Sequence, residues 1–216
     1  MNDLIITSGM ILASFDHLEY DKRMTVLTSD IGKVTVFARG VRRQNSRFIG
    51  KTDPFAFGEF RLFAGKSAYN LSGADISNYF EGIRLDMDTM CYASYFADLS
   101  DYCVKENMDG RSILLLLYRS LQALDTASID NALVRAVFEL RMVMENGVYP
   151  GVPEGRVLPG TASAMKHIEG ADIKSLYSFK VASEVRSELI RTADEYRRKY
   201  VGGSFKSLEV MKDLIL

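Results

Sequence analysis

The sequence predicts an α+β protein in which an N-terminal five-stranded barrel is followed by an all-helical domain. Before residue 80, alternating apolar residues separated by glycine-containing turns indicate short strands. After residue 80, apolar residues recur at helical spacing instead. Strands grouped before helices are typical of an α+β fold or of two separate domains. We therefore expect one domain at residues 1–80 and a second at residues 81–216.

Five strands are expected in the first domain, at residues 9–15, 24–28, 33–39, 55–63 and 67–72. Two turns separate some of them, Asp30-Ile31-Gly32 and Ala64-Gly65-Lys66, and Gly32 suits a left-handed conformation. The apolar phase changes inside the fourth strand, which predicts a bulge near Gly58. Short strands of this number fit a small closed barrel, and the OB-fold is the common five-stranded case.

Five helices are expected in the second domain, at residues 86–105, 111–124, 130–146, 175–201 and 206–215. Asp86 and Asp88 place acids in the first turn of the first helix, where the helix dipole favours them. Gly147 is a stop signal for the third helix. Proline and glycine indicate a loop at residues 148–153, and residues 156–172 are only weakly patterned.

The composition excludes several classes of protein. Cys91 and Cys103 are too few for a disulfide framework, which favours a reducing compartment. The longest apolar run, residues 113–117, is far too short to cross a membrane. No charged-then-apolar leader opens the sequence. A cytoplasmic protein is therefore expected.

Catalytic and metal-binding motifs are not apparent in the sequence. His17 and His167 lie outside any known motif, and the two cysteines point to different faces of one expected helix. Phosphate-loop, HExxH and GxSxG motifs are absent. We therefore expect no enzymatic activity, no cofactor and no metal, with an enzyme of unfamiliar site as the alternative.

The most informative segment is the cationic loop at residues 39–51, which carries Arg and Lys but no acid in a chain of net charge −1. Phosphate binding requires clustered cations without neutralising acids, and Arg also offers a stacking face to bases. A solvated surface loop has the same composition, so charge alone leaves both interpretations open. Phe48 either stacks on a base or, as we favour, anchors the loop to the barrel.

Charge is segregated along the chain, as a docking face requires. From Lys33 to Lys66 there are eight cations but only two acids, Asp53 and Glu59. A second basic patch, around residues 197–206, either binds phosphate or complements a helix dipole. The candidate DNA-binding residues are Lys33, Arg39, Arg42, Arg43, Arg47, Lys51, Arg61, Arg197, Arg198 and Lys206.

A candidate partner-binding site lies on the third expected helix. Arg135 and Arg141 lie beside Leu133, Val137 and Leu140. An apolar groove with a cationic rim is a recurrent way to capture an acidic peptide. The alternatives are that the arginines are ordinary solvated cations and that the apolar residues belong to the core.

Short segments spread over nearly the whole sequence resemble the bacterial RecO DNA-repair proteins, in the same order. They are Gly9-Met10-Ile11-Leu12, Thr25-Val26-Leu27-Thr28, Gly32-Lys33, Ala38-Arg39-Gly40-Val41-Arg42, Pro54-Phe55, Phe138-Glu139-Leu140 with Gly147 and Pro150, and Tyr200, Gly202 and Phe205-Lys206-Ser207-Leu208. Together these matches are specific.

The resemblance implies a mediator of DNA repair and homologous recombination that binds single- and double-stranded DNA and promotes strand annealing. With RecR, such a protein helps to load RecA onto single-stranded DNA coated by single-stranded DNA-binding protein, whose C-terminal acidic tail it also binds. It would act at the nucleoid. The alternative is an adaptor whose barrel binds a peptide, and strong salt dependence of DNA affinity separates the two.

The sequence departs from the family pattern in one region. Many RecO proteins carry four cysteines after the central helix, which form a zinc module. Here residues 148–170 contain no cysteine. Zinc needs thiolate or imidazole ligands, and His167 alone cannot supply them. We therefore predict that this protein holds no zinc.

Overall fold

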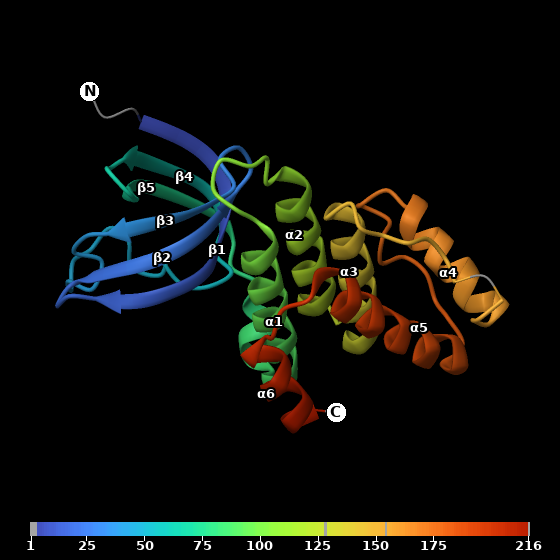
Figure 1. Cartoon of the computed structure of the whole chain (residues 1–216). Coiled ribbons are helices and arrows are strands. Elements are labelled where there is room, and N and C mark those ends of the chain that lie inside the picture. Colours follow the sequence, from blue (N-terminus) through green and yellow to red (C-terminus); the bar gives the residue numbers. More distant parts are fainter. Residues whose placement is uncertain (1–3, 128, 154, 216) are drawn as a thin grey trace. The chain divides into compact units, whose positions relative to one another are not determined.

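The computed structural model describes residues 4–127, 129–153 and 155–215 (Figure 1). Five strands come first and helices follow, which confirms the predicted fold class. Contacts divide the chain into two units. The barrel unit holds the residues up to 81 together with 100–114, and the helical unit holds 82–99 and the residues from 115 onward. The sequence shows the change from strand-like to helical patterning near residue 80, but it does not show that residues 100–114 belong to the barrel unit.

The strands form a closed barrel in the order β1-β2-β3-β5-β4, with β4 returning to β1. Only the pairing of β3 with β5 is parallel. The strands are β1 (Leu4–His17), β2 (Asp21–Thr28), β3 (Lys33–Ala38), β4 (Phe57–Ala64) and β5 (Tyr69–Asn78). This is the five-stranded barrel that the sequence predicts.

Strands β1 and β5 are longer than expected. Strand β1 reaches from residue 4 to residue 17 because its first half pairs with β4 and its second half with β2, with a register shift between Ile11 and Ala13. The bulge predicted near Gly58 is confirmed, since the register of β4 against β5 shifts between Phe57 and Gly58. A Cβ atom at Gly58 would lie 2.1 Å from the carbonyl oxygen of Asp75, so the site requires glycine.

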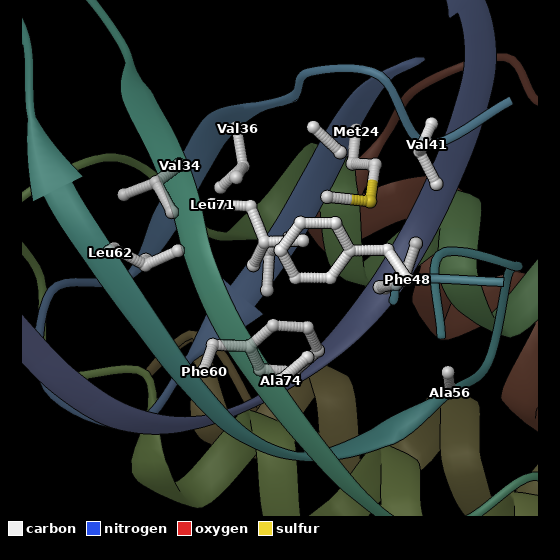
Figure 2. Packing of buried hydrophobic residues seen from close by; sticks show 13 residues of the cluster. Met24, Val34, Val36, Val41, Phe48, Ala56, Phe60, Leu62, Leu71 and Ala74 are labelled. Atoms are coloured by element: carbon white, nitrogen blue, oxygen red, sulfur yellow. The ribbon is translucent and has the colours of Figure 1, made fainter. Parts of the chain in front are cut away.

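The core of the barrel is built from the inward-facing residues of all five strands (Figure 2). Alternation along the strands puts Met24 and Val36 inside and turns their neighbours outward. Phe48 lies buried among these core side chains, which confirms that it anchors the loop. It is therefore not available to stack on a base.

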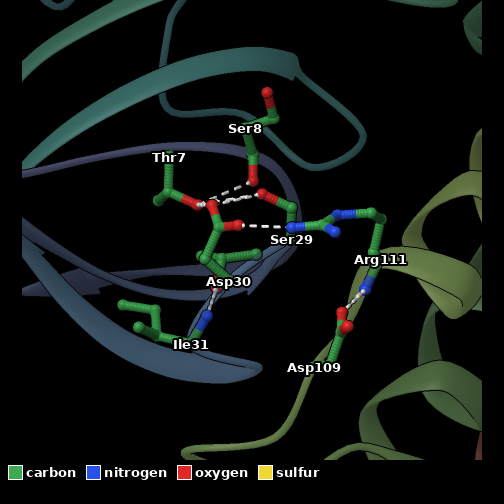
Figure 3. A network of polar contacts seen from close by, with 8 residues as sticks. Thr7, Ser8, Ser29, Asp30, Ile31, Asp109 and Arg111 are labelled. Atoms are coloured by element: carbon green, nitrogen blue, oxygen red, sulfur yellow. Dashed lines mark hydrogen bonds and ion pairs between the residues drawn. The ribbon is translucent and has the colours of Figure 1, made fainter.

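Residues 100–114 cover the outer side of the barrel at the β2–β3 turn. The amides of Asn107 and Gly110 donate to the carbonyl oxygens of Ile31 and Ser29, at 3.0 and 3.1 Å. Arg111 Nη2 donates to Asp30 Oδ1 at 2.9 Å, and Thr7 and Ser29 donate to the other oxygen of that carboxylate (Figure 3). Hydrogen bonds from Ser29, Thr7 and Arg111 lower the pKa of Asp30, so the carboxylate stays ionised and fixes the segment.

Six α-helices follow the barrel, and none of the helices in the described chain is long and apolar enough to span a membrane. They are α1 (Met87–Cys103), α2 (Arg111–Asp125), α3 (Asn131–Glu145), α4 (Pro159–Gly170), α5 (Ser183–Tyr196) and α6 (Lys206–Ile215). A 3-10 helix (Glu81–Leu85) precedes α1, and a π-helical turn (Arg197–Val201) extends α5.

The helical domain differs from the sequence expectation in two places. Residues 156–172, weakly patterned in the sequence, contain α4, which Pro159 opens. The long helix expected at 175–201 starts only at Ser183. The hydroxyls of Ser175 and Ser178 donate to the carbonyl oxygens of Asp172 and Ser175, and such local bonds compete with helix formation.

Candidate nucleic-acid interface

The loop at residues 39–51, between β3 and β4, is held in place by the β1–β2 hairpin. The amide of Gly40 donates to Asp21 Oδ1 at 2.7 Å, and the amide of Arg42 donates to the carbonyl oxygen of Tyr20 at 3.0 Å. Gly40 adopts a φ of 64°, which glycine accommodates without strain. With Phe48 buried beneath it, the loop presents its cations from defined positions.

Arg39, Arg43 and Arg47 are exposed cations of this loop without an acidic partner in the described chain, and of these Arg39 and Arg43 also lack a side-chain hydrogen bond. The Arg39 side chain has neither an ion-pair nor a hydrogen-bond partner among the described residues. The Arg43 guanidinium lies 5.3 Å from the centre of the Tyr20 ring. Because both charges are solvated and uncompensated, they are the ones best placed to neutralise phosphates.

The other cations of the loop are partly engaged. Arg42 pairs with Asp16 at 3.2 Å and also donates to the carbonyl oxygen of Glu19. Arg47 donates to the carbonyl oxygen of Ser72 at 2.8 Å and lies over the Phe48 ring. Lys51 Nζ donates to the carbonyl oxygen of Ala74 at 2.9 Å. These side chains stiffen the loop, and the arginines keep further donors free because a guanidinium has five.

Two predicted DNA contacts of the barrel are compensated by acids. Lys33 Nζ lies 3.3 Å from Asp101 Oδ1. Arg61 Nη2 contacts both Glu59 Oε1 and Asp75 Oδ2, at 3.2 and 2.6 Å. These pairs leave Lys33 and Arg61 less able to attract phosphate than Arg39.

The prediction that Arg197 contacts DNA is wrong. Its side chain lies in the interior of the helical unit, and the residue is only 3% exposed. Arg197 falls at the start of the π-helical turn, where Nη2 pairs with Asp194 Oδ1 at 3.0 Å. Arg198 pairs with the same carboxylate but stays exposed, and Lys206 is exposed at the start of α6.

The predicted groove on α3 is also wrong. Leu133, Val137 and Leu140 are buried core residues, and Arg135 is 3% exposed. Every residue from 133 to 140 is buried, because α3 is packed on all sides rather than on one face. Arg141 donates to the carbonyl oxygens of Ile168, Glu169 and Ala171 at the end of α4, where a cation suits the helix dipole.

A hollow that the sequence did not reveal lies between the loop after α3 and the end of α5. It has a volume of about 170 Å³. Three of its lining residues, Arg156, Arg191 and Lys199, are cations and one is an acid, Glu195. The remaining lining residues are Pro153, Val157, Thr192, Tyr196 and Tyr200. It thus combines positive charge with aromatic surface.

Arg23 on β2 is a further exposed cation, which the charge pattern of the sequence did not reveal. Its side chain is exposed and has no ion-pair or hydrogen-bond partner within the part of the chain that the structure describes. Arg23 does not stand out as part of a basic cluster in the sequence, because three acids closely precede it, Asp16, Glu19 and Asp21. Buried and exposed side chains alternate along this part of β2, and because Met24 is buried, Arg23 next to it faces outward. This alternation could have identified Arg23 from the sequence.

Nothing in the described residues resembles a metal centre or a reactive thiol. They contain no group of three or more His, Cys, Asp or Glu side chains that could hold a metal ion. Neither Cys91 nor Cys103 forms a disulfide within the described residues, and both are half-buried. Burial raises the pKa of the Cys91 thiol, which disfavours the reactive thiolate.

Comparison with known proteins identifies the family. Residues 1–80 match the family model described as Recombination protein O N terminal, and residues 84–153 match Recombination protein O C terminal. The DNA repair protein RecO of Clostridium novyi is 25% identical, with 96% of this chain and 93% of the relative aligned. That of Acetivibrio thermocellus is 24% identical over 96% of each. The chain therefore belongs to the RecO family of DNA repair and recombination proteins.

Proposed function

We propose that this protein is a recombination mediator that binds single- and double-stranded DNA through the barrel unit and catalyses no reaction. The observation that carries the proposal is the anchored loop at 39–51, with Arg39 and Arg43 exposed and without acidic partners among the described residues. Each phosphate that such a cation neutralises releases condensed counterions. Binding led by phosphate contacts depends strongly on salt and little on base sequence.

Replacing Arg39 and Arg43 together by Ala is expected to reduce the salt dependence of DNA binding. Each neutralised phosphate contributes about 0.9 to the log–log salt slope for duplex DNA and about 0.7 for single strands. The slope of the double variant should therefore fall by roughly two units on duplex and somewhat less on single strands. Titration of fluorescent oligonucleotides at several salt concentrations measures it.

Arg61→Ala is the control for this experiment, because Glu59 and Asp75 already compensate that charge. We expect its slope to stay close to that of the unmodified protein. A double variant that unfolds at the normal temperature and keeps the full slope would exclude the loop as the DNA site. A weak salt dependence of the unmodified protein would favour the peptide-binding adaptor.

We further propose that the protein anneals complementary strands and, with RecR, helps to load RecA at the nucleoid. The resemblance to the RecO family supports these roles.

For the acidic tail of single-stranded DNA-binding protein, we propose the hollow beside α5 in place of α3. Support comes from Arg156 and Lys199, which supply cations, and from Tyr196, whose ring lies 5.5 Å from that of Tyr200.

Replacing Arg156 and Lys199 together by Ala should weaken binding of a tail peptide by about tenfold or more, since hydrogen bonds to charged groups contribute about 1.5–3 kcal/mol each. Fluorescence anisotropy with the labelled peptide and the full-length protein measures this. Arg198→Ala is the matched control, because Arg198 is paired with Asp194 and does not line the hollow. Equal peptide affinity in the double variant and the control would place the tail elsewhere.

A further inference from the structure

The helical unit contains another hollow, the α2 pocket, which the proposed functions leave unused. Its volume of about 270 Å³ is close to the lower end of the range for small-molecule sites, roughly 300–1,000 Å³. One wall of the pocket is α2, whose lining residues are Arg119, Gln122, Ala123 and Thr126. Their spacing of three or four residues puts these side chains on one face of the helix.

The opposite wall is the segment between α4 and α5, whose lining residues are Ile173, Lys174, Tyr177 and Ser178. Leu176 is fully buried and fixes this segment to the rest of the helical unit. The Tyr177 hydroxyl lies 2.6 Å from the Ser120 hydroxyl on α2, so a hydrogen bond joins the two walls. The amide of Lys174 donates to Asp172 Oδ1 at 2.8 Å and closes the turn. The pocket therefore has two fixed walls.

The charge of the α2 pocket is positive. Arg119 and Lys174 line it, no acid does, and neither cation has an ion pair within the part of the chain that the structure describes. The Arg119 Nη1 donates to Gln122 Oε1 at 2.7 Å, which orients the guanidinium. The Arg119 Nε is buried and has no hydrogen-bond partner among the described residues. The pocket thus presents an oriented guanidinium that still lacks an acceptor.

The donors and charges of the pocket fit one class of ligand best. A buried N–H without a partner is unfavourable, and water can satisfy a single donor but neutralises neither cation. The Arg119 guanidinium, the Lys174 ammonium and the Gln122 amide together offer more donors than the two oxygens of a carboxylate need. A phosphate monoester has three terminal oxygens and a charge of about −1.5 to −2 at pH 7. It therefore matches two cations, and its oxygens accept paired hydrogen bonds from arginine.

We propose that the α2 pocket binds a small phosphate monoester. Arg119 and Lys174 hold the phosphoryl oxygens, and Gln122 positions Arg119 and donates its own amide to the ligand. Ala123 and Ile173 supply apolar surface for the group esterified to the phosphate. The pocket belongs to the helical unit and the loop at 39–51 to the barrel unit. The inference therefore does not depend on the proposed DNA binding.

Isothermal titration calorimetry of the full chain with inorganic phosphate and with glycerol 3-phosphate, at constant ionic strength, tests the proposal. We expect both to bind. Acetate and dimethyl phosphate carry a single charge and should bind about tenfold more weakly or worse, because one charged contact is lost. The second ionisation of a phosphate monoester has a pKa of about 6, so affinity for glycerol 3-phosphate should fall below that pH. Acetate binding as tight as that of glycerol 3-phosphate would overturn the assignment to a phosphate monoester.

Two variants of the lining residues locate the binding. Lys174→Gln should weaken binding of glycerol 3-phosphate about tenfold or more, since it removes a charged hydrogen-bond donor. Arg119→Lys keeps the charge but loses the planar fork, and a similar loss is expected. Lys180→Gln is the matched control, because Lys180 is exposed on the same segment but does not line the pocket. Its affinity should equal that of the unmodified protein.

The outcomes separate the α2 pocket from the cationic loop. Loss of binding in Lys174→Gln and Arg119→Lys, with normal binding in Lys180→Gln and in the Arg39/Arg43 double variant, supports the proposal. If the Arg39/Arg43 double variant lost phosphate binding and Lys174→Gln kept it, phosphate would bind at the loop and the pocket assignment would be wrong. Absence of binding of both phosphate probes at millimolar concentration would refute it as well, whatever the result with DNA.

Discussion

Replacing Arg197 by Ala is expected to lower the free energy of unfolding by about 3–5 kcal/mol, because it removes one partner from a buried charge network. Arg197 pairs with Asp194 at 3.0 Å. Glu139 on α3 is fully buried nearby and accepts a hydrogen bond from the Tyr95 hydroxyl at 2.7 Å. Burial raises the pKa of Glu139, and the charges of Arg135 and Arg197 oppose that rise. Without Arg197, both carboxylates lose compensation in a medium that disfavours charge.

Urea denaturation at neutral pH measures this loss. Arg198→Ala is the control, because Arg198 pairs with the same Asp194 carboxylate at 2.9 Å but its side chain is 63% exposed. An exposed pair of this kind contributes about 0.2–1 kcal/mol at most. If both variants lost the same small amount of stability, the interior network would not be holding the helical unit together.

The second large effect is expected in the barrel. Phe60 on β4 is completely buried and lies opposite Thr7 on β1 and Ala74 on β5. Figure 2 shows its ring among the core side chains. Phe60→Ala removes the ring and leaves a cavity, because the paired strands cannot move together to fill it. We therefore expect the free energy of unfolding to fall by about 3–5 kcal/mol.

Hydrogen exchange of the strand amides reports the stability of the barrel separately from that of the helices. The amides of all five strands should exchange faster in Phe60→Ala. Phe63→Ala, three residues along the same strand and partly exposed, should alter exchange little. Unchanged protection of the strands in Phe60→Ala would mean that the barrel collapses around the cavity without a lasting cost.

Local features of the fold were predictable from the sequence. The bulge at Gly58 follows from a phase change within one strand, and the anchoring of the loop follows from an apolar ring amid cations. Each of these signals spans only a few residues.

The errors concern burial set by distant elements. The sequence shows the stripe of Leu133, Val137 and Leu140, but not that neighbouring helices surround α3 and enclose Arg135 as well. Arg197 was expected outside because the pattern assumed one regular helix. The π-helical turn starts at this residue, and the structure places its side chain inside. Helical periodicity in the sequence predicts neither the enclosure of α3 by other helices nor the change to a π-helical turn at Arg197.

The discontinuity of the barrel unit also affects how the chain folds during synthesis. Ribosomes add about 5–20 residues per second, so residues 82–114 emerge over roughly 2–7 s after the last strand. During that time the outer side of β2 lacks its cover, including the fully buried Leu27, whose side chain would lie 3.3 Å from a Cβ atom at Gly110. The nascent barrel is therefore completed only when the connection between α1 and α2 returns to it, and it presents an apolar strand surface to other chains until then.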